Sequence, residues 1–285
     1  SAASDVYKRQ IMVLKQKRIN NDILIIDASK GFMKDGKNNK LRASDIKRIV
    51  DVVTARESVC KFSRVVSRDE IRKNDYNLNI PRYVDSSEEA ESWDIYASMF
   101  GGLPTSEIDK LDKYWKAFPL LREELFENSS KGYCQLARND IKKSIKEHSD
   151  VKNFEKKFQK AFQSFNKYLY DKLIVNINES SILKSEEMLS EEMFKRLEDI
   201  PLIDKYEAYQ LLDDDWTEIA IDLEIIQTEG TEAIRKVDPL MVTKKKGGKE
   251  QEVQDGWKGH IIPFELVQNT ILLLSLIHIS EPTRR

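Results

Sequence analysis

Hydrophobic residues near the start of the chain gather in short runs that predict β-strands. The run Ile23–Ala28 opens with four consecutive apolar residues, which is typical of a buried strand. Ile11–Leu14 and Phe62–Val66 are shorter β-compatible runs. In Asp75–Val84 the apolar positions alternate, and Pro81 allows only an edge strand there. The pattern therefore predicts a small strand-containing segment over about residues 11–85.

Helical and loop signals lie between these runs. Ser29–Arg42 contains two glycines and an Asn-Asn pair, so we expect a loop. Ser67 and Glu70 have the spacing of a capping box, which predicts a brief helix. Ser44 is expected to cap a longer helix. That helix would carry apolar residues at helical spacing, namely Ile46, Ile49, Val50 and Val53.

Beyond Ser86 the pattern is almost entirely helical. Gly101–Pro104 should end one helix, and Thr105 or Ser106 should start the next. A long helix is predicted over Asp150–Val175, where an aromatic stripe is more typical of a packing seam than of a ligand site. Its members are Phe154, Phe158, Phe162, Phe165, Leu169 and Leu173. Two more helices are expected over 185–197 and 204–227, and a hairpin over 241–253 with two central glycines.

The balanced net charge of −2 hides two oppositely charged segments. Residues 142–172 hold nine Lys against four acids, whereas residues 179–232 hold seventeen acids against four bases. An acidic segment will not approach DNA phosphates, so it suits a solvated face or a basic protein partner. The two cysteines, Cys60 and Cys134, are far apart, which favours a reducing cytoplasm over a disulfide framework.

Other candidate chemistry is weak. Asp213–Asp215 cannot converge on one metal ion, because consecutive helical residues point about 100° apart. His148 and His260 have no second His or Cys nearby in sequence, so zinc or nucleophilic chemistry is not supported. No apolar run reaches the roughly 20 residues that a membrane span needs, so no membrane association is expected.

The two ends of the chain resemble translated sequencing adapter. Residues 1–10, SAASDVYKRQ, match the translation of one adapter arm, and residues 274–284, LSLIHISEPTR, match that of the other. We therefore expect residues 1–10 and 274–285 to be adapter-derived and about 11–273 to be an open-ended gene segment.

Several segments together resemble the modification subunit of type I restriction–modification systems, an N6-adenine DNA methyltransferase family. They are ILIIDASKGF (23–32), DIKRIVDVV (45–53), FSRVVSRDEIRKNDYNLNIPRYVD (62–85) and DGWKGHIIPFELV (255–267). The third is the most specific. Their order and spacing also match, so the resemblance covers nearly all of residues 11–273.

The resemblance implies a Rossmann-like methyltransferase domain followed by a helical C-terminal region. It implies S-adenosylmethionine as cofactor and DNA adenine as substrate. The implied partners are a specificity subunit, a second modification subunit and a motor-nuclease restriction subunit, with DNA. Within the family pattern, Asn77, Asn79, Pro81, Arg82 and Tyr83 match the NxNIPRY signature. They could shape a DNA-facing or domain-junction surface; alternatively, the Asn side chains cap turns and Tyr83 packs.

The sequence departs from the family's catalytic pattern. Its glycine pairs, Gly101-Gly102 and Gly247-Gly248, lie downstream of where a cofactor loop would stand, and it contains no Pro-Pro pair for the tetrapeptide that grips a flipped adenine. No catalytic, cofactor-binding or metal-binding residue can therefore be assigned, and we expect these 285 residues alone to be inactive.

The predicted fold class is α+β and mostly helical. Residues 11–85 would be the C-terminal edge of a Rossmann-like methyltransferase domain, 86–240 a helical C-terminal region, and 241–273 a short β element with the start of a further segment. The predicted role is scaffold and subunit docking. The alternative is a non-catalytic helical interaction or DNA-binding module, which the basic segment 142–172 would favour.

Overall fold

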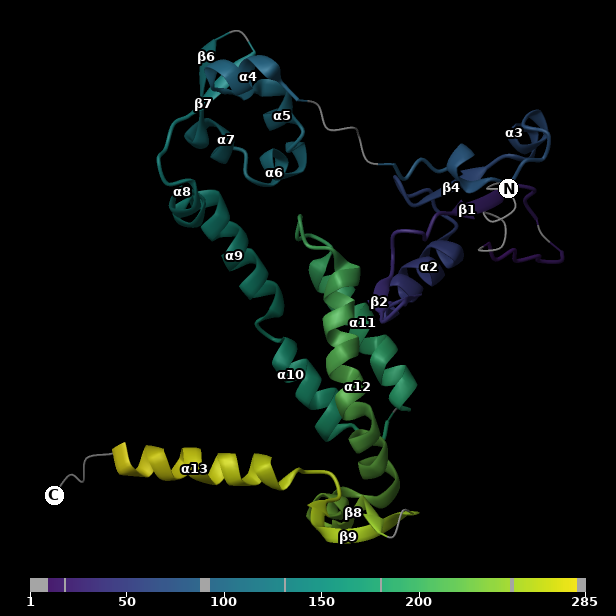
Figure 1. The fold of residues 1–285 in the computed structure, drawn as a ribbon, viewed down its shortest axis with the longest axis vertical. Helices are drawn as coiled ribbons and strands as arrows, with labels where there is room; N and C mark the ends of the chain where they lie inside the picture. Colours follow the sequence, from purple (N-terminus) through teal and green to yellow (C-terminus); the bar gives the residue numbers. More distant parts are fainter. Residues whose placement is uncertain are drawn as a thin grey trace. The chain divides into compact units, whose positions relative to one another are not determined.

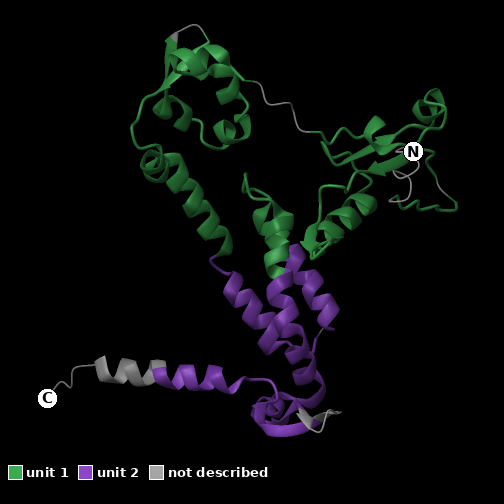
Figure 2. Ribbon diagram, viewed as in Figure 1, with its two compact units in different colours: residues 1–162, 193–212 green, residues 163–192, 213–285 purple. Residues whose placement is uncertain are grey.

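The computed structural model describes residues 10–17, 19–87, 93–130, 132–179, 181–246 and 249–280. The chain is mostly helical with short antiparallel strands (Figure 1), which confirms the predicted α+β class. It divides into two compact units, residues 1–162 with 193–212 and residues 163–192 with 213–285 (Figure 2). These units need not coincide with domains, so the predicted domain boundaries stay predictions. None of the helices within the described ranges combines the length and hydropathy needed to cross a bilayer.

The N-terminal segment is built on a two-stranded antiparallel sheet. Strand β1 (Ile23–Ile26) pairs with β4 (Ser63–Val66), with Ile23 opposite Val66. Both strands were predicted. Helix α3 (Arg68–Lys73) begins where Ser67 Oγ accepts a hydrogen bond from Glu70 N at 3.2 Å, as the capping signal predicted. The core of this segment consists of five buried side chains, Ile25, Val66, Ile71, Tyr83 and Val84.

Three sequence predictions in this segment are wrong. Residues 11–14 form no strand, and Ile11 is 93% exposed because no neighbouring strand covers it. Residues 75–84 contain a 3₁₀ turn, η2 (Ile80–Arg82), because Pro81 fits its first turn and lacks the N–H that a ladder requires. The predicted loop 29–42 contains a hairpin of β2 (Met33–Asp35) and β3 (Asn38–Lys40), which turns at Gly36 with φ +59°.

The next part of the chain combines short helices with a three-stranded sheet that the sequence pattern did not predict. The strand order is β5–β7–β6, with both pairings antiparallel. As predicted, one helix ends at Gly101 and the next begins at Thr105. The elements are α4 (Ile95–Phe100), β5 (Leu103–Pro104), α5 (Thr105–Asp109), α6 (Asp112–Ala117), α7 (Leu121–Leu125), β6 (Phe126–Ser130) and β7 (Tyr133–Leu136).

The aromatic stripe acts partly as the expected packing seam. Phe154 packs against the buried cluster of Phe118, Leu121 and Leu125, with its ring 5.7 Å from that of Phe118. The predicted helix over 150–175 is interrupted, however. Ser164, with φ −100° and ψ 3°, leaves the helical conformation, and serine competes for backbone hydrogen bonds. The elements are α8 (Ile141–Glu147), α9 (Ser149–Phe162), α10 (Phe165–Tyr170) and the π-helical turn η3 (Asp171–Val175).

Two long helices follow, as predicted. Helix α11 (Ile182–Leu197) contacts α12 (Lys205–Glu229) through Phe194, whose ring lies 5.6 Å from that of Tyr206. Asp204 Oδ1 accepts a hydrogen bond from Tyr206 N at 2.8 Å at the predicted start of α12.

The predicted hairpin is confirmed and is longer than expected. Strand β8 (Val237–Lys246) pairs antiparallel with β9 (Lys249–Gly259), after a 3₁₀ turn, η4 (Thr231–Arg235). The two central glycines, 247–248, lie outside the described residues. Helix α13 (Phe264–Ser280) follows and its backbone continues past residue 274, the predicted start of adapter. Residues 1–9 and 281–285 of the predicted adapter segments lie outside the described residues.

Candidate functional site

The predicted signature residues form a compact turn beside the β1–β4 sheet. Asn77 Oδ1 accepts a hydrogen bond from Asn79 N at 2.9 Å, which is the turn-capping role of an Asn side chain. The Tyr83 hydroxyl donates to Asn77 O at 2.5 Å, and Tyr83 is only 5% exposed. The phenol therefore closes the turn and fills the core at the same time.

Pro81 and Arg82 lie on the outer side of this turn. Both are exposed, and Arg82 Nη1 donates to Asn74 Oδ1 at 3.2 Å. The contacts of Asn77 and Tyr83 match the alternative in which Asn side chains cap turns and Tyr83 packs, whereas Asn79 Oδ1 has no hydrogen-bond partner among the described residues. A DNA-facing or domain-junction role for the exposed side stays a prediction.

Asp27 anchors the far end of the signature segment. It follows β1 directly, and its backbone N donates to Phe62 O at 2.8 Å. Its carboxylate accepts hydrogen bonds from Ser29 N at 3.0 Å and Ser86 Oγ at 2.5 Å. Burial alone would raise the pKa of Asp27, but the hydrogen bonds from Ser86 and Ser29 outweigh it and hold the pKa below its ordinary value.

A cavity of about 330 Å³ lies between β4, the loop before it and the end of the signature segment. Its lining includes Ser58, Cys60, Lys61, Arg64, Tyr83 and Asp85. Polar and cationic groups of this kind can hold a polar ligand group. They do not pair a nucleophile with a base, so bond-making chemistry has no basis in this cavity.

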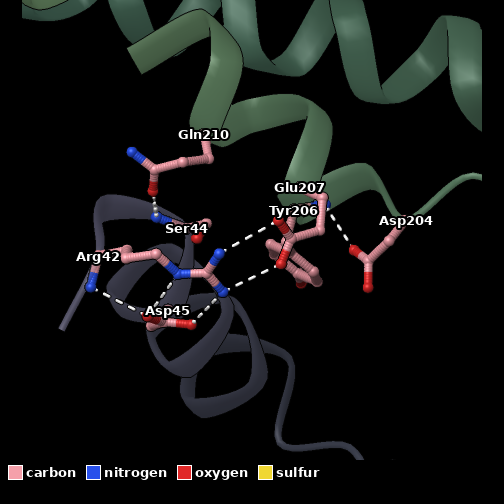
Figure 3. Close-up of polar contacts among 7 residues, drawn as sticks. All are labelled: Arg42, Ser44, Asp45, Asp204, Tyr206, Glu207 and Gln210. Carbon is pink, nitrogen blue, oxygen red and sulfur yellow. Dashed lines mark hydrogen bonds and ion pairs between the residues drawn. The ribbon is translucent and has the colours of Figure 1, made fainter. Parts of the chain in front are cut away.

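A second polar arrangement joins the start of α2 (Ala43–Ala55) to the start of α12 (Figure 3). Arg42 Nη1 and Nη2 donate to the two carboxylate oxygens of Glu207 at 3.1 and 3.0 Å. Its Nε and Nη2 also donate to Asp45 Oδ2 and Oδ1, both at 3.1 Å, and its backbone N donates to Asp45 Oδ2 at 2.9 Å. One guanidinium therefore joins two carboxylates from helices 165 residues apart in sequence.

Gln210 completes this contact. Its Oε1 accepts a hydrogen bond from Ser44 N at 3.0 Å, so a side chain of α12 satisfies an N–H in the first turn of α2 (Figure 3). Ser44 was predicted to cap this helix, and that prediction is wrong, because the cap position is two residues earlier, at Arg42, and the helix begins at Ala43. The Ser44 side chain is 2% exposed and lies inside the helix.

Cation–π contacts of Lys47 and Arg48 add to the packing around α2. The Arg48 guanidinium carbon lies 4.3 Å from the ring centre of Phe62 and 5.6 Å from that of Tyr206. Lys47 Nζ lies 5.5 Å from the ring centre of Phe194 on α11. Burial, with a smaller contribution from the Asp51 carboxylate, raises the pKa of Tyr206 to about 12. The phenol therefore stays neutral, and the face of α2 that packs on α11 and α12 is held by positive charges over aromatic rings.

Gly31 allows the Asp45 carboxylate to approach the loop after β1. A Cβ atom at residue 31 would stand 2.8 Å from Asp45 Oδ1. The absence of a side chain at residue 31 thus brings two of the family-like segments, 23–32 and 45–53, into contact.

Sequence reasoning missed four residues of these polar contacts, namely Asp27, Asp45, Glu207 and Gln210. Asp27 had a usable signal, because it is a charged residue placed directly after a buried strand. Asp45 stands three residues after the helix cap, which is the reciprocal position of a capping box. Glu207 and Gln210 had no local signal, because their partners are more than 160 residues away in sequence.

A third polar cluster lies at the base of the β8–β9 hairpin. His260 Nδ1 lies 2.7 Å from Asp238 Oδ2, and His260 Nε2 lies 3.5 Å from Glu229 Oε1 at the end of α12. Lys236 Nζ lies 2.6 Å from the other oxygen of Glu229. The hydrogen bond with Asp238, followed by the charges of Asp238 and Glu229, raises the pKa of His260 above its ordinary value despite some opposition from burial. Protonated His260 therefore links the hairpin to the helix.

This cluster predicts a pH-dependent attachment of the hairpin. Because the folded pKa of His260 exceeds the unfolded value of about 6.5, its contribution to stability is fully present below about pH 6.5. That contribution is lost as the pH rises through the folded pKa. An NMR titration of the imidazole protons, assigned with His260→Gln, should show a midpoint above 6.5. Asp238→Asn should lower the midpoint, whereas Asp255→Asn, which removes a carboxylate paired with Lys244 elsewhere on the hairpin, should not. An equal effect of both variants would contradict the assignment.

The remaining candidates show no converging chemistry. His148 is buried, and its Nδ1 accepts a hydrogen bond from Asp150 N at 3.1 Å. Across the described ranges, no three His, Cys, Asp or Glu side chains are placed to hold a metal ion. Asp213–Asp215 lie within α12. Taken together, the described sites anchor helices, turns and strands.

The family-model match to known proteins lies in the first third of the chain. Residues 5–92 match the family model described as N-6 DNA Methylase, and this match starts within the ten residues predicted to be adapter-derived. The methylase subunit of the type I restriction enzyme MpnII from Mycoplasma pneumoniae is 40% identical over 86 residues, which are 30% of this chain and 16% of that relative. The methylase subunit of the type I restriction enzyme MjaVII from Methanocaldococcus jannaschii is 39% identical over 111 residues, or 36% of this chain and 19% of that relative. The chain thus spans less than a fifth of these relatives.

A solved structure is similar over the same small share. The type I restriction-modification system methyltransferase subunit from Streptococcus thermophilus is 46% identical where it aligns, with 26% of this chain and 16% of that chain covered and a TM-score of 0.26. The family model and the curated relatives agree on one assignment. Residues 5–92 are similar to the N-6 DNA methylase family and to type I methylase subunits, which confirms the resemblance predicted from the sequence.

Proposed function

We propose that the chain is part of the methylation subunit of a type I restriction–modification enzyme, an S-adenosylmethionine-dependent DNA adenine-N6 methyltransferase. Within that enzyme, these residues serve as scaffold and docking surface. The single observation that carries the proposal is the family match over residues 5–92, supported by two curated type I methylase subunits at about 40% identity.

In this proposal, residues 11–85 are the C-terminal edge of a Rossmann-like domain. Two features support it. The sheet of β1 and β4 has only two strands among the described residues, and two-stranded sheets are marginal in water. Helix α2 also leaves an apolar stripe half exposed, formed by Ile46, Val50 and Val53. Further strands and helices of a larger domain would pair with the sheet and cover this stripe.

The helical region beyond residue 92 would dock other subunits. The Arg42–Glu207 and Ser44–Gln210 contacts attach α12 to the family-matched segment, as a scaffold role requires. The acidic segment 179–232 favours a basic protein surface over DNA phosphate. The proposed partners are the specificity subunit, a second modification subunit and the motor-nuclease subunit, with DNA as substrate, in the cytoplasm.

The described residues do not fit the methyl donor itself. A nucleotide-like cofactor needs a glycine-rich turn whose backbone it can approach closely. Near the β1–β4 sheet, Gly31 faces Asp45 and Gly36 turns an exposed hairpin, so neither lines such a turn. We therefore assign no residue of this chain to S-adenosylmethionine and no step of methyl transfer to these sites.

A matched pair of proteins tests the proposal. The 285-residue chain should transfer no labelled methyl group from S-adenosylmethionine to adenine-containing DNA above a heat-treated control. The same chain preceded by its genomic upstream coding region, and combined with its specificity subunit, should transfer methyl groups to adenine. Transfer by the 285 residues alone would contradict the scaffold role. An upstream region lacking both the glycine-rich loop and the Asn/Asp-Pro-Pro-Phe/Tyr tetrapeptide would overturn the family function.

A further inference from the structure

Helices α8 and α9 carry a set of lysines without partners. All of them have exposed side chains, and within the described part of the chain none takes part in an ion pair. They are Lys142, Lys143, Lys146, Lys152, Lys156 and Lys160. Over the same stretch, residues 142–160, the acids are Glu147, Asp150 and Glu155. Asp150 is already engaged, because its Oδ2 accepts a hydrogen bond from Leu120 N at 3.0 Å.

On α9 the unpartnered lysines form one stripe. A step of about 100° per residue places Lys152, Lys156 and Lys160 within an arc of about 80°. The aromatic seam that begins at Phe154 lies on the opposite side of the helix, and Phe154 packs inward against Phe118. A rise of about 1.5 Å per residue spaces successive lysines about 6 Å apart along the helix. The same helix therefore has an apolar face, which packs against the Phe118 cluster at Val151 and Phe154, and a cationic face toward solvent.

We propose that this lysine stripe binds the phosphate backbone of duplex DNA without regard to base sequence. Lysine ammonium groups act as point charges toward phosphate, and each phosphate contact releases counterions from the duplex. A protein partner fits less well. Interface cores between proteins are rich in aromatic residues and depleted of lysine, and α9 turns its aromatic residues away from the stripe.

The proposal does not depend on the methylase assignment, because the stripe lies outside the family-matched residues 5–92. It adds a DNA contact to a region proposed above only for subunit docking. The whole chain has a net charge of −2, so general attraction to DNA is absent and the contact must be local. Binding should consequently be weak and should fall steeply with salt.

Fluorescence anisotropy with a labelled 30-base-pair duplex of arbitrary sequence tests this, using the full 285-residue chain across a potassium chloride series. The logarithm of the binding constant should fall linearly with the logarithm of the salt concentration. The triple variant Lys152→Gln/Lys156→Gln/Lys160→Gln should bind at least about tenfold more weakly at 0.1 M salt. Its slope should be smaller by about 2.7, since each lost phosphate contact removes about 0.9.

Two further variants distinguish DNA binding by the stripe lysines from an effect of the total charge of the chain. Lys110→Gln/Lys116→Gln/Lys244→Gln removes the same charge from lysines already paired with Glu107, Asp112 and Asp255, and should bind like the original chain. Replacing the three stripe lysines with Arg should retain binding. Equal loss in both Gln variants, or no salt-dependent binding by the original chain, would overturn the proposal. So would salt-sensitive self-association that the stripe variant abolishes without any DNA binding, because that result assigns the stripe to an acidic protein surface.

Discussion

Tyr83→Ala is expected to lower the free energy of unfolding of the N-terminal segment by about 3–5 kcal/mol, the range for truncating a buried aromatic side chain. Tyr83 is 5% exposed and belongs to the core cluster with Ile25, Val66 and Ile71. Its hydroxyl also closes the turn through Asn77 O. The variant therefore loses both the packing of Tyr83 against the β1–β4 sheet and the turn geometry. Hydrogen exchange of peptides covering the two strands should accelerate accordingly.

Tyr83→Phe is the matched control. It keeps the ring and removes only the hydrogen bond, so it should cost about 1 kcal/mol. Arg82→Ala changes an exposed side chain of the same turn and should leave exchange in β1 and β4 nearly unchanged. If Tyr83→Ala left the exchange of β1 and β4 unaltered, the turn would not support the sheet, and the packing interpretation of the signature would be wrong.

Elements with a strong local pattern were predictable from sequence. Ile23–Ile26 forms the strand that its apolar run predicted, with Ile25 buried and its neighbours half-buried, and α3 starts after Ser67 because the hydroxyl satisfies a first-turn N–H. Helices α11 and α12 followed from helical periodicity, and the β8–β9 hairpin followed from its central glycines. In each case the information lies within a few residues of the element itself.

Elements that depend on tertiary partners were not predictable. Ile11–Leu14 has strand-forming residues, yet a strand needs a neighbour, and these residues are almost fully exposed. The sheet of β5, β7 and β6 includes a two-residue strand, Leu103–Pro104, which is too short for any alternation pattern. Residues 75–84 alternate in polarity, but Pro81 and the Asn77 turn impose a 3₁₀ conformation instead.

The same division holds for the candidate sites. The signature turn could be located from sequence because the hydrogen bonds that shape it span fewer than ten residues. The junction between α2 and α12 could not, because Arg42 is an ordinary helix-flanking residue until Glu207 is brought beside it. Only folding places the two residues together.

Arg42→Ala is expected to lower the free energy of unfolding by about 2–3 kcal/mol, because it leaves the Asp45 carboxylate without its charged donor. The Asp45 side chain is only 10% exposed and receives three hydrogen bonds from Arg42, of which only the backbone N bond would remain. Glu207 is 61% exposed, so its part of the interaction is screened by solvent and adds little. Pulse proteolysis across a urea series can measure the loss. The matched control Glu207→Gln should cost no more than about 0.5–1 kcal/mol.

The same variant should change the acid sensitivity of the protein. Burial acts to raise the pKa of Asp45, but the hydrogen bonds and charge of Arg42 outweigh it and hold that pKa below its ordinary value. The carboxylate therefore contributes stability above the unfolded pKa of about 3.9, and this contribution is lost as the pH falls through the lower folded pKa. Without the Arg42 side chain, only the backbone hydrogen bond from residue 42 and the charge of Arg48 oppose burial, so the pKa of Asp45 should rise and the loss should begin at higher pH. The double variant Arg42→Ala/Asp45→Asn removes the buried charge and should recover part of the stability at pH 7. If Glu207→Gln proved as costly as Arg42→Ala, or if the double variant recovered nothing, the stabilising contact would not be the Arg42–Asp45 pair.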